Sequence, residues 1–548
     1  MSPKTTGRKR VRKACIPCHE RKRKCDAKYP CGRCIRYEYD CRYPEGSTPD
    51  AMGGGVPTPS PDRSSMERDR HEGPTVRSPG IFDEQKFRYS GASAVTAFPH
   101  LLGAALGSDS PPNMRSVASN FGIRPEEASN AHGFLGSLIS EAELARFSKV
   151  YLEVLGPIGD LMDSEFYAQR CRDYYQTAGS NAVGFAAVAA GVAALGSFLS
   201  PQKHPRESDL VQYAKAILDD PSSMRLHGID HIVAWGMRVF YLRATTRPSN
   251  TWIASCTQMH LCEVMGLHEE ENVKKIASTA RAAALGYDAD RLRRIFWISW
   301  AGNTMLSYEY DHSPVCFRAV TCQPILGVPG SVADQFVKLI QIIPSANSPF
   351  QHELQPQSPS EELFKRLRAL EEFNYTHPFL LVTKADLAFC FYRRLYQLDI
   401  HVPDDIIQLI IGRGNAAVEA AKQQANDGYL FWNVIGSVFQ YTCILLAMDT
   451  PTASTHIDAA FEGLEDLVKA VDTGLTREAL SMARHLLSLK IAKKRKELAQ
   501  LEAVEGGDRL FQEPLASEAN PAVPDIGEGV DWNQFFMEPY WDPDFPLF

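Results

Sequence analysis

The chain has 548 residues, of which 44% are hydrophobic and 23% are charged. This composition excludes a fibrous or wholly disordered protein and leaves room for several packed domains. The formal net charge of −8 hides an asymmetry, because residues 1–44 carry fourteen Lys or Arg and only four Asp or Glu. A basic head of charge +10 on a remainder of charge −18 predicts a polyanionic partner for the head alone.

Residues 1–14 form a basic arm. The opening sequence MSPKTTGRKRVRKAC is not followed by an apolar core and does not fit a secretory signal. We therefore expect a reducing compartment, where clustered cysteines bind metal more often than they form disulfides. The run from Arg8 to Lys13 fits a nuclear import signal, an arm that binds the DNA backbone, or both.

Six of the thirteen cysteines fall within residues 15–41. They are Cys15, Cys18, Cys25, Cys31, Cys34 and Cys41, with the spacing C-x2-C-x6-C-x5-C-x2-C-x6-C. Thiolates at x2 spacing converge on one Zn²⁺, and six thiolates complete two tetrahedral sites only if two of them bridge both metals. The first cysteines of the two C-x2-C-x6-C repeats, Cys15 and Cys31, are the natural bridges. A segment this short depends on the metal to fold.

This stretch resembles the binuclear zinc cluster (Zn2Cys6) of fungal transcription regulators in its six cysteines, its basic run after the second cysteine, and Pro30. The resemblance implies two Zn²⁺ ions, bridging by the first and fourth cysteines, a nuclear location, and binding to double-stranded DNA at CGG-type triplets. The alternatives are a zinc module used for protein contacts and a disulfide knot.

The basic run Arg21, Lys22, Arg23 and Lys24 is expected to form a short helix held at both ends by metal ligands. A helix fits the DNA major groove, where Lys and Arg bind guanine O6 and N7. By resemblance to the family, Lys22 is the principal base-reading residue with Arg21 beside it, whereas Arg23 and Lys24 contact phosphates. The family usually has Arg or Lys after the second cysteine, and His19 departs from that pattern.

Residues 42–133 are expected to form a disordered linker. Twenty of the thirty-five residues from 46 to 80 are Gly, Ser, Thr or Pro. Many family members dimerise through a coiled coil after the cluster, but residues 46–130 show no sustained heptad pattern. The protein therefore binds DNA as a monomer, or it forms a homodimer through its body.

Residues 134–500 are expected to form an all-α regulatory domain. Helices are expected at 140–155, 182–199, 208–219, 228–244, 250–267, 289–308, 378–397, 403–424 and 428–448, with a last pair within 455–500. Ser140 and Glu143 fit a capping box at the first of them. The stretch 182–199 is too rich in Ala and Gly for a membrane span, so a buried helix and no membrane partner are expected.

Two stretches of this domain resemble the middle homology region of the same regulators. The first ends in a Gly-Leu-His turn at residues 266–268, and the second contains an Arg-Arg-x-Phe-Trp helix at residues 293–297. The family usually follows this helix with Gly-Arg-Pro, whereas this chain has Val-Cys-Phe at residues 315–317.

No enzymatic activity is expected. The sequence has no HExxH, GxSxG or phosphate-binding glycine loop, and the run His268 to Glu271 is interpreted as a solvated helix end. Seven cysteines outside the cluster show no x2 spacing and are interpreted as small buried hydrophobic residues. They are Cys171, Cys256, Cys262, Cys316, Cys322, Cys390 and Cys443.

Residues 501–548 are expected to form an acidic, aromatic and disordered activation tail. From residue 505 onward it holds ten Asp or Glu and one Arg. Such a segment folds when its aromatic residues dock into a coactivator groove, and the expected anchors are Trp532, Phe535, Phe536 and Trp541. The alternative is a tail that packs on the body. The basic patch at 490–497 fits a solvated helix face better than a second import signal.

The sequence as a whole predicts a nuclear, zinc-dependent, sequence-specific RNA polymerase II transcription factor. The favoured role is a pathway-specific activator, for a secondary-metabolite gene cluster rather than nutrient utilisation. The alternatives are a transcriptional repressor with the same DNA-binding head and a ligand-sensing modulator or enzyme. The last of these needs a polar pocket with convergent ionisable groups in the helical body.

Overall fold

The structure is a computed structural model of the chain. It describes residues 14–20, 25, 34, 42, 81–83, 88–91, 94, 97–109, 111, 133–179, 182–220, 228–345, 359–429 and 431–505. The chain divides into two compact units, residues 1–76 and 77–548. The first contains the cysteine cluster with α1 (Ile16–Glu20), and the second contains the helical body.

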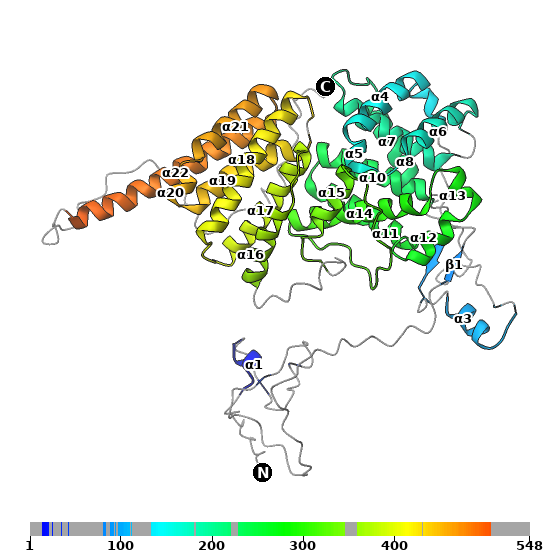
Figure 1. Ribbon diagram of the computed structural model, residues 1–548, viewed down its shortest axis with the longest axis horizontal. Helices are drawn as coiled ribbons and strands as arrows, with labels where there is room; N and C mark the ends of the chain where they lie inside the picture. The colour runs from blue at the N-terminus through cyan, green and yellow to red at the C-terminus, as the bar shows by residue number, and fades with distance from the viewer. Residues whose placement is uncertain are drawn as a thin grey trace, which may run out of the picture. The chain divides into compact units, whose positions relative to one another are not determined.

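The body is built almost entirely of helices, which confirms the expected all-α class (Figure 1). Its elements are β1 (Ile81–Asp83), β2 (Arg88–Ser90), α3 (Phe98–Ala105), η1 (Leu135–Ser137), α4 (Glu141–Val154), α5 (Gly156–Gly159), α6 (Ser164–Gln176), α7 (Val183–Leu199), α8 (Glu207–Leu218), α10 (Ile229–Thr245), α11 (Pro248–Val264), α12 (Glu270–Ala277), α13 (Ala280–Ala284), α14 (Ala289–Glu309), α15 (Val332–Ile340), α16 (Pro359–Ala369), η3 (Leu370–Glu372), α17 (Pro378–Gln397), α18 (Asp404–Asn426), α19 (Asn433–Met448), α20 (Pro451–Ser454), α21 (Ile457–Ala470) and α22 (Gly474–Glu505). Every helix expected between residues 134 and 500 is present. The short helix expected over residues 21–24 lies outside the described residues. The structure also contains helices that the sequence did not predict, such as α6 and α16, which lie between the predicted helices along the chain.

The helices of the body form two groups that lie side by side. Helices α4 to α15 make one group and α16 to α22 the other, and they meet where α17 contacts α14 and α15 (Figure 1). One hydrophobic cluster runs through both groups. Cavities where the groups meet are therefore lined by residues far apart in the sequence.

Helix α7 is the centre of the first group and packs against α4, α8 and α10. Its Ala- and Gly-rich sequence allows this close packing. A Cβ built on Gly196 would lie 2.0 Å from the carbonyl oxygen of Phe147, so only glycine fits at that crossing. The buried helix expected here is confirmed. None of the helices in the described part of the chain is both long enough and apolar enough to span a membrane.

The capping box expected at α4 is present. The Ser140 hydroxyl accepts a hydrogen bond from the Glu143 amide at 3.3 Å, and the Glu143 carboxylate accepts one from the Ser140 amide at 3.0 Å. Each side chain thus satisfies a backbone donor that the first helical turn leaves open. The helix then buries Leu144, Phe147 and Tyr151 on one face.

The two stretches that resemble the middle homology region contact each other through an ion pair. Glu270 lies just after the Gly-Leu-His turn and accepts hydrogen bonds from the Arg293 guanidinium (Nε to Oε2, 3.1 Å) and from the Gln323 amide (3.0 Å). The interpretation of residues 268–271 as a solvated helix end is wrong for His268 and Glu270, which are only 6% and 8% exposed. The reason is that the loop after α14 folds over them, with two of its amides donating to the His268 carbonyl oxygen.

Arg294 lies beside Arg293 in the same helix and has a different set of partners. Its guanidinium is buried, and it binds Asp160 (2.8 Å), Asp290 (2.8 Å) and Asp334. One cation thereby holds α5, α14 and α15 together, since three carboxylates balance its charge. Trp297 of the same motif is buried and donates from Nε1 to the Gln323 carbonyl oxygen at 2.8 Å.

Part of the stretch that the sequence assigns to the linker packs on the body. Strands β1 and β2 pair antiparallel, and β2 contacts α11. The ring of Tyr89 meets that of His268 edge to face, with centroids 5.2 Å apart. This hairpin contributes the aromatic side chains of Phe82 and Tyr89, whereas residues 46–80 contain no Phe, Tyr or Trp.

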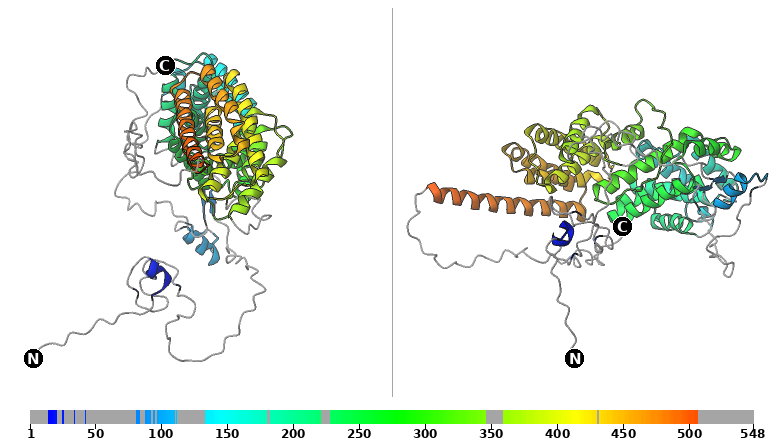
Figure 2. Two further views of the ribbon diagram at one scale, coloured as in Figure 1. Left: turned by 90° about the vertical axis from the view of Figure 1, so that its left-hand side faces the viewer. Right: turned by 90° about the horizontal axis from the view of Figure 1, so that it is seen from below.

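Helix α22 is the longest helix of the described chain, with 32 residues. It begins against α19 and α21, and its last turns extend away from the other helices of the body (Figure 2). The basic patch at 490–497 is tied to the body by two of its lysines: Lys490 donates to the Leu446 carbonyl oxygen (2.7 Å), and Lys494 pairs with Asp449 (2.9 Å). The side chains between them face solvent, as expected of a solvated helix face.

Candidate metal centre and DNA-binding module

The first two cysteines of the cluster are positioned by one turn of helix. Cys15 precedes α1 and Cys18 lies within it, and the His19 amide donates to the Cys15 carbonyl oxygen at 2.9 Å. Residues three apart on such a turn lie on the same side, so both thiols point the same way. Both side chains are buried, at 0% and 2% exposure.

The sulfur atoms of Cys15, Cys18 and Cys34 lie within 4.8 Å of one another, and that of Cys25 lies 3.8 Å from that of Cys15. The Cys15 and Cys34 sulfurs are 3.6 Å apart. A disulfide requires about 2.05 Å, so neither Cys25 nor Cys34 is bonded to Cys15. Four thiolates at about 2.3 Å around a tetrahedral Zn²⁺ lie about 3.8 Å apart, which is close to these distances. The donor set therefore fits zinc.

Cys15 is in contact with both halves of the cysteine pattern. Cys25 belongs to the first C-x2-C-x6-C repeat and Cys34 to the second, and the Cys15 sulfur is 3.8 Å and 3.6 Å from their sulfurs. A thiolate with neighbours from both repeats has the position needed to bridge two metal ions.

The two ends of the module are also joined by a backbone hydrogen bond that no sequence pattern predicted. The Ile16 amide donates to the Arg42 carbonyl oxygen at 2.7 Å. This bond brings together the two ends of the cysteine-rich stretch. No local pattern could have revealed it, because any non-proline residue supplies the same backbone groups.

Several predicted site residues lie outside the described residues. Two of the cysteines, Cys31 and Cys41, are among them. The whole basic run from Arg21 to Lys24 also lies outside the described residues. The four aromatic residues expected as anchors in the tail, Trp532, Phe535, Phe536 and Trp541, also lie outside.

The cysteines of the body differ from those of the cluster. Cys262 and Cys390 are buried, and burial raises the pKa of each thiol to about 12, so both stay protonated at neutral pH. They fit the interpretation as small buried hydrophobic residues. Cys316 does not, because its side chain is exposed in the loop after α14.

Comparisons with known proteins identify the class to which this module belongs. The fungal Zn(2)-Cys(6) binuclear cluster domain matches residues 13–49. Protein RDR1 of Saccharomyces cerevisiae is 38% identical over 511 residues, covering 90% of this chain and 92% of the yeast protein. Transcription factor kojR of Aspergillus oryzae is 31% identical, covering 90% of this chain and 86% of its own. No solved structure matches the chain.

Two more distant relatives are named for opposite effects on transcription, one as a repressor and one as an activator. A probable transcriptional repressor of Schizosaccharomyces pombe, C1348.12, is 24% identical over 48% of this chain and 62% of its own. The citrinin biosynthesis transcriptional activator mrl3 of Monascus ruber is 23% identical over 64% of this chain and 71% of its own.

The chain belongs to the fungal Zn2Cys6 transcription factors. It is therefore a DNA-binding transcription factor rather than an enzyme, and its cofactor is a pair of Zn²⁺ ions. When bound, the two ions supply the folding energy that a module of this size cannot obtain from apolar burial.

Proposed function

We propose that this chain is a nuclear, sequence-specific RNA polymerase II transcription factor that recognises CGG-type triplets. The observation that carries the proposal is the position of Cys15. Its sulfur lies 3.8 Å from that of Cys25 and 3.6 Å from that of Cys34, as a shared ligand of a binuclear cluster requires. The nuclear location follows from the family and from the basic run between Arg8 and Lys13.

The proposed ligands of the two Zn²⁺ ions are all six clustered cysteines, with Cys15 and Cys31 as the bridges. The complete set is Cys15, Cys18, Cys25, Cys31, Cys34 and Cys41. Six thiolates and two divalent ions have a combined charge of about −2. The Lys and Arg residues between the cysteines offset this charge and leave a positive surface for DNA.

The proposed DNA-reading segment is the basic run that follows α1. Helix α1 ends at Glu20, so Arg21 and Lys22 continue directly from a turn held by Cys15 and Cys18. Lys22 and Arg21 are assigned to guanine bases, and Arg23 and Lys24 to phosphates. Metal ligands on both sides, Cys18 and Cys25, would fix the direction in which this segment enters the major groove.

The proposed regulatory role is that of a pathway-specific activator, and the favoured target is a secondary-metabolite gene cluster. Two features support this role: the acidic, aromatic composition of residues 501–548, and the relative mrl3, whose name is that of a biosynthesis activator. The tail would recruit a coactivator through Trp532, Phe535, Phe536 and Trp541. The named repressor among the relatives favours repression as the second candidate role.

We also propose that the protein forms a homodimer through its helical body. Helix α22 exposes apolar side chains at seven-residue spacing, namely Leu475 (59% exposed), Met482 (46%) and Leu489 (43%). Residues seven apart lie on one face of a helix, and we propose that a second copy of the helix packs on this face. Dimer formation would make the protein read two triplets at a fixed spacing.

The proposal is tested by selecting bound sequences from random DNA with the full-length protein, in zinc and in excess chelator. The expected result is enrichment of a CGG-type triplet that chelation abolishes and Lys22→Ala weakens by about tenfold. Lys493→Ala removes the same charge from an exposed site on α22 and should leave the selected sequence unchanged. Binding without a preferred sequence, or binding that survives chelation, would contradict the proposal. Two triplets at fixed spacing would indicate a dimer and a single triplet a monomer.

A further inference from the structure

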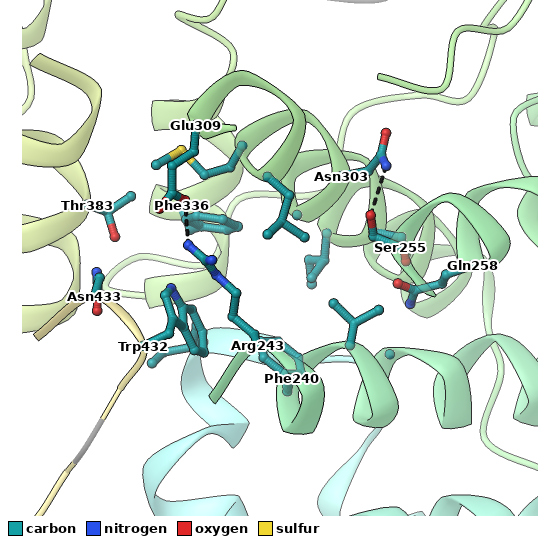
Figure 3. Close-up of a pocket in the computed structure, with 18 of the residues that line it drawn as sticks. Phe240, Arg243, Ser255, Gln258, Asn303, Glu309, Phe336, Thr383, Trp432 and Asn433 are labelled. Carbon is teal, nitrogen blue, oxygen red and sulfur yellow. Dashed lines mark hydrogen bonds and ion pairs between the residues drawn. The ribbon is translucent and has the colours of Figure 1, made fainter. Parts of the chain in front are cut away.

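The body contains a cavity where its two groups of helices meet. The space not filled by atoms is about 760 Å³, including the part open to solvent. Its wall comes from α5, α10, α11, α14 and α15 on one side and from α17 and the start of α19 on the other. Figure 3 shows polar side chains from separate helices around this cavity.

One part of the cavity wall is aromatic. Phe336 packs on Phe379 with ring centroids 5.8 Å apart, and Phe379 meets Trp432 edge to face at 5.7 Å. Phe240 lies 6.0 Å from Trp432 on the same wall. These contacts hold the rings in place, so a bound molecule would meet a wall that needs no further ordering.

Arg243 is the one cation among the described residues that line the cavity, and it already has its partners. The Arg243 guanidinium binds the Glu309 carboxylate and the Tyr310 hydroxyl, and it lies 5.1 Å over the Tyr310 ring. Burial opposes the charge, but Glu309 and Tyr310 more than compensate and raise the pKa of Arg243 above its usual value. The charge of Arg243 is therefore balanced within the protein.

The negative charge of Asp386 on α17 is not balanced by a neighbouring cation of the described chain in this way. Its carboxylate accepts hydrogen bonds from the Ser437 hydroxyl and, at 3.4 Å, from the Asn433 amide. Among the described residues no cation lies within ion-pair distance of it. An interior carboxylate without a counter-ion is costly in free energy, and such a group at a cavity is a candidate for ligand binding.

Asn433 supplies a second and independent sign of a missing partner. Its side chain is 6% exposed and lines the cavity, and its amide oxygen has no hydrogen-bond partner among the described residues. More than nine in ten buried polar groups are hydrogen-bonded, so an acceptor left open here indicates an absent donor. The open acceptor and the uncompensated carboxylate lie side by side.

We propose that this cavity binds a small organic molecule that joins a protonated amine to an apolar or aromatic body. The ammonium group would pair with the Asp386 carboxylate and donate to the Asn433 amide oxygen. The body of the molecule would pack on the rings of Phe240, Phe379 and Trp432, whose faces attract cations. An anionic ligand would be repelled, because the wall carries the two carboxylates of Asp386 and Glu309 against the one guanidinium of Arg243.

The protonation state of Asp386 sets the conditions for a test. Burial raises the pKa of this carboxyl to about 7, with a further increase from Glu309 on α14, while Ser437, Asn433 and Arg243 lower it. At pH 8 the carboxylate is ionised, and an alkyl ammonium keeps its proton as a lysine side chain does. The amine and its acceptor then carry opposite charges.

The cavity also offers a substitution that blocks it without removing a polar group. A Cβ built on Gly302 of α14 would meet nothing within 4 Å, and Gly302 lines the cavity. Gly302→Leu therefore fills the space from a helical position where leucine is a better helix former than glycine.

The test uses the full-length, zinc-loaded protein at pH 8 and three probes that share a phenyl ring: 2-phenylethylammonium, 2-phenylethanol and phenylacetate. Calorimetry should show saturable binding of the ammonium, at least tenfold tighter than of the alcohol and with no binding of phenylacetate. Asp386→Asn should weaken the ammonium at least tenfold, and Gly302→Leu should abolish its binding. Asp405→Asn, an exposed aspartate on α18, should change nothing.

Three results would overturn the proposal: no saturable binding of the ammonium, equal or tighter binding of phenylacetate, or unchanged ammonium binding by both cavity variants. Circular dichroism establishes whether each variant is folded. If Asp386→Asn does not fold, the ammonium binding of Gly302→Leu alone tests the proposal. The readout does not involve DNA, so its failure would leave the proposed DNA-binding function standing.

Discussion

Arg293 and Glu270 are 23 residues apart in the sequence and form a two-pronged ion pair between the start of α14 and the start of α12. The side chains are about one-tenth exposed, and Glu270 also holds the loop after α14 through the Gln323 amide. The pair thus joins the two stretches that resemble the middle homology region to the loop after α14.

Removing one partner of this pair should destabilise the body. Arg293→Leu leaves the largely buried Glu270 carboxylate with only Lys274, whose exposed ammonium lies 3.7 Å away, and losing the main partner of such a pair typically costs about 3 kcal/mol. Urea unfolding of the full-length protein, followed by circular dichroism, measures the loss. Glu271→Gln is the matched control, because Glu271 is exposed and pairs only with Lys275 at the surface. An equal effect of both substitutions would contradict the structural role of the pair.

The same carboxylate should make the body sensitive to acid. Hydrogen bonds from Arg293 hold the pKa of Glu270 below its usual value. Its stabilising contribution is therefore complete above the unfolded-state pKa of about 4.3 and is lost as the pH falls through the lower folded-state pKa. Melting temperatures from pH 6 to pH 3 should fall more steeply for the wild type than for a Glu270→Gln variant. Parallel curves would contradict this assignment.

The cysteine geometry predicts different effects for bridging and non-bridging ligands. Wild-type protein should contain two zinc ions per chain. Cys15→Ser removes the thiolate that lies close to both Cys25 and Cys34, so both ions should be lost together. Elemental analysis of the purified full-length protein gives the ratio, and Cys316→Ser, an exposed cysteine of the body, should retain two. One ion retained by Cys15→Ser would mean that Cys15 does not bridge.

Two helical glycines should respond oppositely to alanine. At Gly196 the added Cβ would lie 2.0 Å from a backbone oxygen of α4, whereas at Gly302 it would meet nothing within 4 Å. Gly196→Ala should therefore lower the free energy of unfolding by about 2 kcal/mol or more. Gly302→Ala should raise it by about 0.5–1 kcal/mol through helix propensity. Denaturant unfolding of the two variants side by side checks both signs, and a neutral Gly196→Ala would argue against the close α4–α7 crossing.

Asp386 should make the body less stable as the pH rises. The unfolded chain releases this proton near pH 3.9, and the folded protein keeps it until about pH 7, so stability declines between these values. Asp386→Asn should therefore raise the free energy of unfolding at pH 8 by an amount on the order of a few kcal/mol, and by little near pH 4. Asp405→Asn, at a carboxylate that is 60% exposed, should show no such gain at pH 8. A gain for Asp386→Asn that is the same at both pH values would contradict the raised pKa.

Local signals predicted much of the fold correctly. The capping box at Ser140 and Glu143 and the apolar periodicity of α4 are confirmed, because both depend on residues within a few turns of one helix. The interpretation of His268 and Glu270 as solvated was wrong, because residues 320–323 cover them from a distant part of the sequence. Burial by a distant segment leaves no trace in a local pattern.

The sequence by itself determined the metal chemistry, since the spacing of six cysteines in 27 residues leaves few ways to arrange their thiolates. It also determined most of the long helices, such as α4, α7 and α14, since caps and periodicity act locally. Only the tertiary structure decided that Asp386, Asn433, Arg243 and Glu309 share one cavity, because they come from four helices of two different groups. The physical reason is that a buried charge depends on which distant groups surround it, and this is set when helices pack rather than when they form.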